Sequence, residues 1–242
     1  GVDAARELLG AHVLRGADHR ALQGQRGTGP ERPPFDRPTH LLGARGWIED
    51  ELVGYDKKRR VGLWQALPDG DLQELISGSG IRRVHVLAWR DLEDPEAGGS
   101  ELHAHEVLKR WSTAGLEVVL RTSTVAGMPE RVVRDGYEVV RRSGRYRVFA
   151  VAALDELRRR HGKRDALVEV WNGMPFLTPV WGRGPRMVIQ HHDHSAMWPL
   201  VLSPTPARLG SLLERRLAPP FYRSTPVVTL SRSSAEGLIT GL

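Results

Sequence analysis

Residues 81–121, which read IRRVHVLAWRDLEDPEAGGSELHAHEVLKRWSTAGLEVVLR, contain the pattern that decides the fold. The short, mostly apolar run from Val84 to Trp89 is typical of a buried parallel strand. A polar turn over residues 90–99 follows, and Ser100 can cap a helix whose apolar residues recur at helical spacing until Gly115. A second strand then begins at residue 117. This order predicts parallel strands joined by a helical crossover.

The same cycle continues to the end of the chain. We predict further strands over residues 137–141, 166–171, 186–191 and 227–230, helices over 147–160 and 206–217, and a last helix opening near Ser231. Such alternation predicts an α/β fold in which helices cover both faces of a parallel sheet. Ligands of open parallel sheets bind outside the carboxyl ends of the strands, so the informative residues should follow each strand.

Residues 1–80 lack this rhythm, and we interpret them as an irregular N-terminal extension to a domain that spans residues 81–242. Residues 24–38 mix Gly, Pro, Arg and Asp without periodicity, which predicts a linker or disorder. The basic run Lys57–Arg60 would bind an anion if it were a functional patch, but we favour its interpretation as a solvated turn.

Charge and composition restrict the possible partners. The formal net charge is +6, and the first 80 residues carry 11 Lys and Arg against 12 Asp and Glu, so the whole basic excess lies in residues 81–242. This excess favours anionic lipid headgroups or phosphorylated substrates, whereas nucleic acid is disfavoured because aromatic residues do not interleave with the basic ones. The absence of cysteine excludes disulfides and thiolate chemistry. No apolar run reaches half of the roughly 18 residues of a membrane span, so we expect a cytoplasmic protein, compatible with peripheral contact at the inner membrane face.

The first candidate site is the turn that precedes the helix at residue 100. Gly98 and Gly99 allow a close approach of backbone to an anion or a sugar, and the helix N-terminus at Ser100 offers N–H groups with partial positive charge. The turn has neither G-x-G-x-x-G nor a Walker lysine, so a purely connecting role is an equally open interpretation. Four carboxylates precede the glycines and argue against a plain polyphosphate cradle.

The second candidate site follows the strand at residues 166–171. Asn172 could hydrogen-bond a polyhydroxylated ligand through both ends of its amide, and Trp171 could stack on a sugar face. Asn172-Gly173 is also a favoured turn, and that interpretation stays open.

The third candidate site is the run His191-His192-Asp193-His194. As metal ligands, His191, Asp193 and His194 could combine with His103, His105 or Glu106 in a zinc or di-metal hydrolase. Alternatively, one histidine could donate a hydrogen bond to a substrate hydroxyl or phosphate while the others serve structural roles. A third interpretation makes all of them surface or packing residues.

Taken together, the segments from residue 82 to residue 242 resemble the N-terminal domain of retaining glycosyltransferases of family 4, which have the GT-B fold. The order and spacing of five segments carry the resemblance: Asp94–Glu101, Glu106–Gly115, Asp165–Phe176, Pro185–His194 and Pro226–Glu236. The resemblance implies a Rossmann-like sheet and hexosyl transfer from a nucleotide sugar to a carbohydrate, lipid-linked or small-molecule acceptor.

The resemblance also implies roles for single residues. Gly98 and Gly99, with Ser100, would face the donor's diphosphate and sugar, and His194, or alternatively His191, would hydrogen-bond the donor sugar and orient it. The acceptor cleft would be bordered by Glu101, Asn172 and Trp171. In this family the leaving phosphate is thought to accept the acceptor's proton, so the protein supplies positioning and charge stabilisation. No metal or other cofactor is expected.

The chain departs from the family in one large respect. A GT-B enzyme has a second domain that grips the nucleotide, with an Arg/Lys pair and a Glu-x7-Glu element, and Leu242 falls where that domain would begin. We therefore expect the isolated chain to lack transferase activity. A non-catalytic binding module remains an alternative, with the basic run Arg158, Arg159, Arg160, Lys163 and Arg164 as its contact surface. We favour the interpretation of this run as the solvated end of a helix.

Overall fold

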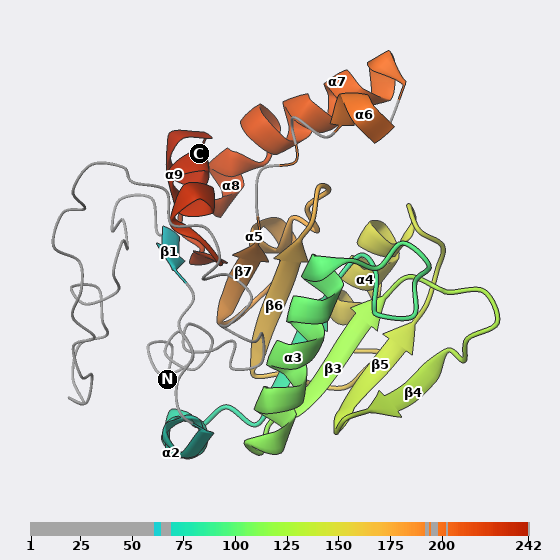
Figure 1. Cartoon of the computed structure of the whole chain (residues 1–242). Coiled ribbons are helices and arrows are strands. Elements are labelled where there is room, and N and C mark those ends of the chain that lie inside the picture. Colours follow the sequence, from blue (N-terminus) through green and yellow to red (C-terminus); the bar gives the residue numbers. More distant parts are fainter. Residues whose placement is uncertain (1–60, 64–68, 192–193, 195–197, 202, 242) are drawn as a thin grey trace, which may run out of the picture.

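The computed structural model describes residues 61–63, 69–191, 194, 198–201 and 203–241 (Figure 1). Within this part of the chain, eight strands form one sheet in the order β1-β8-β7-β6-β2-β3-β5-β4. The predicted linker at residues 24–38 and the basic run Lys57–Arg60 lie outside the described residues, as do His192 and Asp193.

Seven of the strands are parallel and form the centre and one edge of the sheet. Their bounds are β1 Val61–Leu63, β2 Arg83–Leu87, β3 Glu117–Thr122, β5 Tyr137–Arg141, β6 Ala166–Trp171, β7 Arg186–Gln190 and β8 Val227–Thr229. The remaining strand, β4 Arg131–Arg134, pairs antiparallel with β5 through a turn in which Asp135 and Gly136 have positive φ. The strands β7, β6 and β2 are neighbours, which brings the loops that follow them together.

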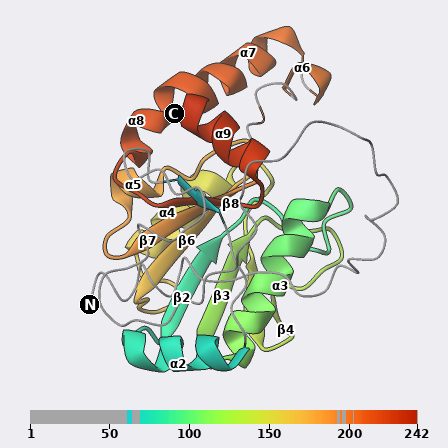
Figure 2. The same ribbon diagram turned by 60° about the vertical axis from the view of Figure 1, so that its left-hand side comes forward.

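Helices cover both faces of the sheet (Figures 1 and 2). On one face α2 Asp69–Ser79 and α3 Gly99–Thr113 share a core with Val84, Val86 and the β6 valines. On the other face α4 Val148–Leu157 packs on Leu87 and Leu167, while α8 Pro219–Tyr222 and α9 Arg232–Gly241 pack on Trp171 and Val188. The remaining helical elements are α5 Thr178–Trp181, α6 Trp198–Val201, α7 Pro204–Leu212 and the π-helical turn η1 Leu213–Leu217. The predicted α/β class, a Rossmann-like parallel sheet with helices on both faces, is confirmed.

Several helices begin or end at residues other than those predicted from the sequence. The helix predicted over residues 147–160 ends at Leu157, because Arg159 and Gly162 have positive φ and turn the chain toward β6. The helix predicted over 206–217 begins at Pro204 and continues into η1. Two elements that precede residue 81 also belong to this unit, since β1 pairs with β8 and α2 contributes Leu72 and Ile76 to the core. Among the described residues, no helix is long and apolar enough to cross a membrane.

Candidate functional site

The three segments predicted to carry chemistry meet at the carboxyl ends of β2, β6 and β7. The side-chain amide of Asn172, after β6, donates to Ser100 Oγ at 2.8 Å and to Glu101 Oε1 at 3.2 Å, both in the first turn of α3. The next backbone amide, Gly173 N–H, donates to His194 Nδ1 at 3.1 Å, after β7. A continuous hydrogen-bonded path therefore links the diglycine turn to the histidine segment.

The turn before α3 is held by Glu101 rather than by the predicted cap, Ser100. Gly98 is the N-cap, and its N–H donates to Glu101 Oε2 at 2.8 Å, while the Ser100 hydroxyl donates to the same oxygen at 2.9 Å. Glu101 is buried by these contacts and by Asn172, so its carboxylate organises the turn and is not presented to a ligand.

Neither glycine of the turn is required by the protein's own backbone or packing. Gly98 has an extended conformation with φ −136°, and Gly99 is not among the residues with positive φ. A Cβ placed on Gly99 would meet no heavy atom within 4 Å, and one on Gly98 would meet only Glu101 Oε2 at 3.8 Å. The missing side chains leave open space in front of the N-terminus of α3, where a helix of 15 residues concentrates partial positive charge.

Arginines neutralise the acidic loop between β2 and this turn. Asp91 is buried and accepts a hydrogen bond from Arg141 Nε at 3.0 Å. Arg145 binds Asp94 at 3.1 Å and Glu96 at 2.8 Å, and its hydrogen bond lowers the pKa of the Glu96 carboxyl. Further pairs complete the set: Arg134 with Asp91 and Glu93, and Arg90 with Glu96 and Glu101. The carboxylates that argued against a plain polyphosphate cradle thus serve to brace the loop.

The hydrogen bond to Gly173 fixes the tautomer of His194. A backbone N–H can only donate, so Nδ1 of the neutral ring is the acceptor and Nε2 carries the proton. The backbone N–H of His194 donates to Glu214 Oε1 at 3.0 Å, and Trp198 Nε1 donates to Oε2 of the same carboxylate at 2.9 Å. Glu214, which lies in η1, therefore holds the histidine segment in place, and its Oε1 lies 3.5 Å from the same Nδ1 that accepts from Gly173.

His191 is engaged with a histidine of α3. Its Nε2 lies 3.1 Å from His103 Nδ1, and the two rings form an edge-to-face pair with centroids 5.0 Å apart. The carbonyl of His191 accepts a hydrogen bond from Thr229 Oγ1. Burial lowers the pKa of His103 to about 4, so this imidazole is neutral near pH 7. The geometry gives His191 a packing role and leaves His194 as the histidine at the Asn172-Gly173 turn.

The predicted stacking role of Trp171 is wrong. The Trp171 ring is fully buried, its Nε1 donates to the Gly173 carbonyl at 2.9 Å, and it packs on Tyr222 with ring centroids 4.6 Å apart. Successive residues of a strand point to opposite faces, and Trp171 shares the α8 face with Glu169. Its buried side chain therefore stabilises the Asn172-Gly173 turn and has no exposed face on which a sugar could stack.

A buried carboxylate that was not predicted from the sequence also supports this turn. Glu169 Oε1 accepts hydrogen bonds from Phe176 N–H and the Tyr222 hydroxyl, both at 2.7 Å, and Oε2 accepts from the Thr178 hydroxyl at 2.6 Å. Burial raises the pKa of Glu169 despite these donors, and burial next to Glu169 also raises that of Tyr222. The only sequence signal is a charged residue inside the otherwise apolar strand at residues 166–171.

The metal-hydrolase interpretation gains no support from the described residues. His103 and His191 come together, whereas His105 binds the Tyr137 hydroxyl and approaches Asp135, on another side of α3. The described ranges contain no group of three or more His, Asp or Glu side chains that could hold a metal ion. His192 and Asp193 are outside those ranges.

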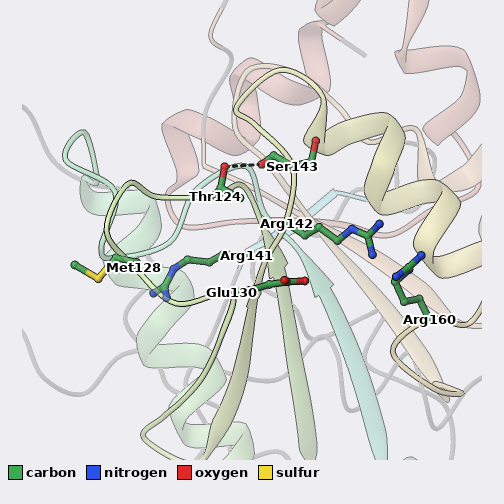
Figure 3. A pocket seen from close by; sticks show the side chains of 7 residues that line it. All are labelled: Thr124, Met128, Glu130, Arg141, Arg142, Ser143 and Arg160. Atoms are coloured by element: carbon green, nitrogen blue, oxygen red, sulfur yellow. Dashed lines mark hydrogen bonds between the residues drawn. The ribbon is translucent and has the colours of Figure 1, made fainter.

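A separate cavity lies beside the β4–β5 hairpin (Figure 3), lined by Thr124, Met128, Glu130, Arg141, Arg142, Ser143 and Arg160. None of the predicted site residues lines it. Arg142 and Arg160 both pair with Asp155, at 3.6 and 3.1 Å, and Arg164 pairs with Glu156 at 2.8 Å. Two members of the basic run at residues 158–164 are therefore committed to acids of α4.

No protein-family model matches the chain, and a search of curated proteins finds no match.

Proposed function

We propose that this domain is the acceptor-side domain of a retaining glycosyltransferase, which moves a hexosyl group from a nucleotide sugar to an acceptor. One observation carries the proposal: Asn172 and Gly173 connect the diglycine turn of α3 to His194 through hydrogen bonds of 2.8 and 3.1 Å. The family resemblance assigns these two segments to the same ligand, and a common site at one edge of the sheet is the geometry that this assignment requires.

The chemistry of each segment suits a sugar diphosphate. The N-terminus of α3 supplies partial positive charge to the diphosphate through an opening that no protein side chain fills at Gly99. His194 Nε2–H is the donor for a sugar hydroxyl, because Nδ1 is occupied by Gly173. During transfer the bond from the sugar to the phosphate breaks, the acceptor oxygen bonds to the sugar, and the acceptor's proton passes to the leaving phosphate. The protein then contributes orientation and charge stabilisation.

A Gly99→Ala substitution tests the anion site directly. The added methyl group meets no protein atom within 4 Å, so folding stability should be unchanged or slightly higher, while a diphosphate at the turn should be displaced. We expect saturation-transfer NMR with UDP-hexoses and GDP-hexoses to detect binding to the wild-type chain and to lose it in the variant.

The matched control is Gly70→Ala. Gly70 also lies in the first turn of a helix, α2, with no atom within 4 Å of its added Cβ. Equal binding by both variants, or absence of nucleotide-sugar binding to the wild type, would contradict the proposal.

A second domain that grips the nucleotide is part of this proposal, so this domain, tested without such a partner domain, should turn over no nucleotide sugar. When such a domain is supplied, His194→Ala should lower turnover by about 2–3 kcal/mol of barrier, as expected for one preorganised donor. His105→Ala, on α3 and turned toward Tyr137, should leave turnover unchanged. Chelators should also have no effect, and loss of activity with a chelator would favour the metal-hydrolase alternative.

A further inference from the structure

Large apolar side chains are exposed along α7, η1 and α8. The exposed fractions are 63% for Leu209, 45% for Leu212, 49% for Leu217 and 52% for Phe221. Isolated exposed leucines are common on soluble proteins, but four large apolar side chains within 13 residues form a patch that needs an explanation.

The π-helical turn aligns these side chains. In α7, Leu209 and Leu212 are three residues apart and share one side of the helix. Leu217 follows five residues later, and the turn η1 has i→i+5 hydrogen bonding, with Ala218 N–H donating to the Leu213 carbonyl at 2.8 Å. The extra residue in this turn returns Leu217 to the side of Leu209 and Leu212. The opposite side, with Ala207, Glu214 and Ala218, is buried.

Basic residues accompany the apolar ones without exposed acids. Four arginines are exposed between Ser203 and Ser224, namely Arg208, Arg215, Arg216 and Arg223. The single acid of this stretch, Glu214, is 4% exposed and binds His194 N–H and Trp198 on the inner side. The outer surface of the stretch is therefore both apolar and cationic.

Within this segment, α7 extends outward from the sheet in both views (Figures 1 and 2), whereas α8 packs against the sheet. Gly210 allows α7 to pack closely on the Trp198 ring, because a Cβ at this position would lie only 2.8 Å from that ring. The segment is thus anchored on its inner side, close to His194, while its outer side is accessible.

We propose that the outer side of residues 204–223, the α7–α8 face, docks on the surface of an anionic lipid bilayer. The leucines and Phe221 enter the boundary between headgroups and acyl chains, and the arginines bind lipid phosphates. A cationic surface with large aliphatic side chains and no exposed acid has the composition of an interfacial membrane helix. Docking places the candidate site, which Glu214 joins to this segment, near the membrane surface.

Vesicle co-sedimentation of the full chain tests the proposal. We expect binding to phosphatidylcholine vesicles that contain about one third phosphatidylglycerol, weaker binding at high salt, and little binding to pure phosphatidylcholine. The double variant Leu209→Glu with Leu212→Glu should weaken binding more than about tenfold, because it removes apolar contacts and repels anionic lipid. Leu157→Glu is the matched control, since Leu157 is 57% exposed at the end of α4, and it should bind as the wild type does.

The charge contribution is measured separately. Arg208→Gln and Arg216→Gln should each weaken binding to anionic vesicles about fivefold, whereas Arg158→Gln, exposed after α4, should not. His194→Ala should bind vesicles normally, so a failure of the glycosyltransferase proposal leaves this result unaffected. Absence of vesicle binding, or an equal loss in the Leu157 control, overturns the proposal. Light scattering provides a second test. If the wild-type chain is a dimer that the Leu209/Leu212 double variant disrupts, and it binds no vesicles, a second copy of the chain occupies this face and the proposal is overturned.

Discussion

The buried histidine of α3 should make the protein sensitive to mild acid. His103 is 5% exposed, and burial lowers its pKa from 6.5 to about 4. Between these two values the unfolded chain binds a proton at this residue and the folded chain does not. The free energy of unfolding therefore falls as the pH decreases from 6.5 toward 4.

The size of the effect follows from the two pKa values. Each pKa unit corresponds to 1.36 kcal/mol, so the difference between 6.5 and about 4 amounts to about 3 kcal/mol. This is a large part of the 5–15 kcal/mol that stabilises a typical domain. His103→Asn is the informative variant, because its side-chain amide can replace Nδ1 opposite His191 Nε2 and does not titrate.

Urea denaturation followed by tryptophan fluorescence, at several pH values between 6.5 and 4, measures the effect. The difference in unfolding free energy between wild type and His103→Asn should shift by about 3 kcal/mol over this range, in favour of the variant at acid pH. The pKa values of His105 and His161 are also lowered by burial, but both residues are present in each protein, so their contributions cancel. Parallel pH profiles for the two proteins would refute the reasoning.

Three further predictions concern side chains around the site. Asp91→Asn should destabilise the protein by about 3–5 kcal/mol in thermal or urea unfolding, because it leaves the buried Arg141 guanidinium without its carboxylate; a loss below 1 kcal/mol would contradict this account. Burial raises the pKa of Glu169 in the folded state, so wild-type stability should decline as the pH rises above 4.5, and Glu169→Gln should abolish that decline. Gly210→Ala should cost about 1–3 kcal/mol through overlap with Trp198, and an unchanged melting temperature would show that this contact yields easily.

The alternation of short apolar runs with helical periodicity was sufficient to predict the parallel centre of the sheet. The strand β4 was missed, although Asp135-Gly136 between two valine-containing runs is a hairpin signal. Arg131–Arg134 is short, begins and ends on arginine, and lies at the edge of the sheet, where its second residue and its fourth are only partly buried. An edge strand of this kind lacks the continuous apolar character by which the central strands are recognised.

The candidate site could be predicted where chain order alone determines position. Loops that follow neighbouring parallel strands lie at the same edge of the sheet, so Gly98, Asn172 and His194 could be grouped from the sequence. The role of Trp171 depended on a contact with Tyr222, some 50 residues later in the chain, which no local pattern records. The same holds for Glu214, whose contacts with His194 and Trp198 depend on how η1 returns over the sheet.

A run of basic residues in the sequence does not by itself identify a surface that binds an anionic partner. The sequence drew attention to Arg158–Arg164, yet Arg160 and Arg164 neutralise Asp155 and Glu156 within the same layer. Arg141 and Arg145 are likewise used to brace the acidic loop before α3. A basic side chain acts on an external partner only if the fold supplies no acid for it. Between Ser203 and Ser224 the one acid is turned inward while Arg208, Arg216 and Arg223 are exposed, so an anionic surface should meet the protein there.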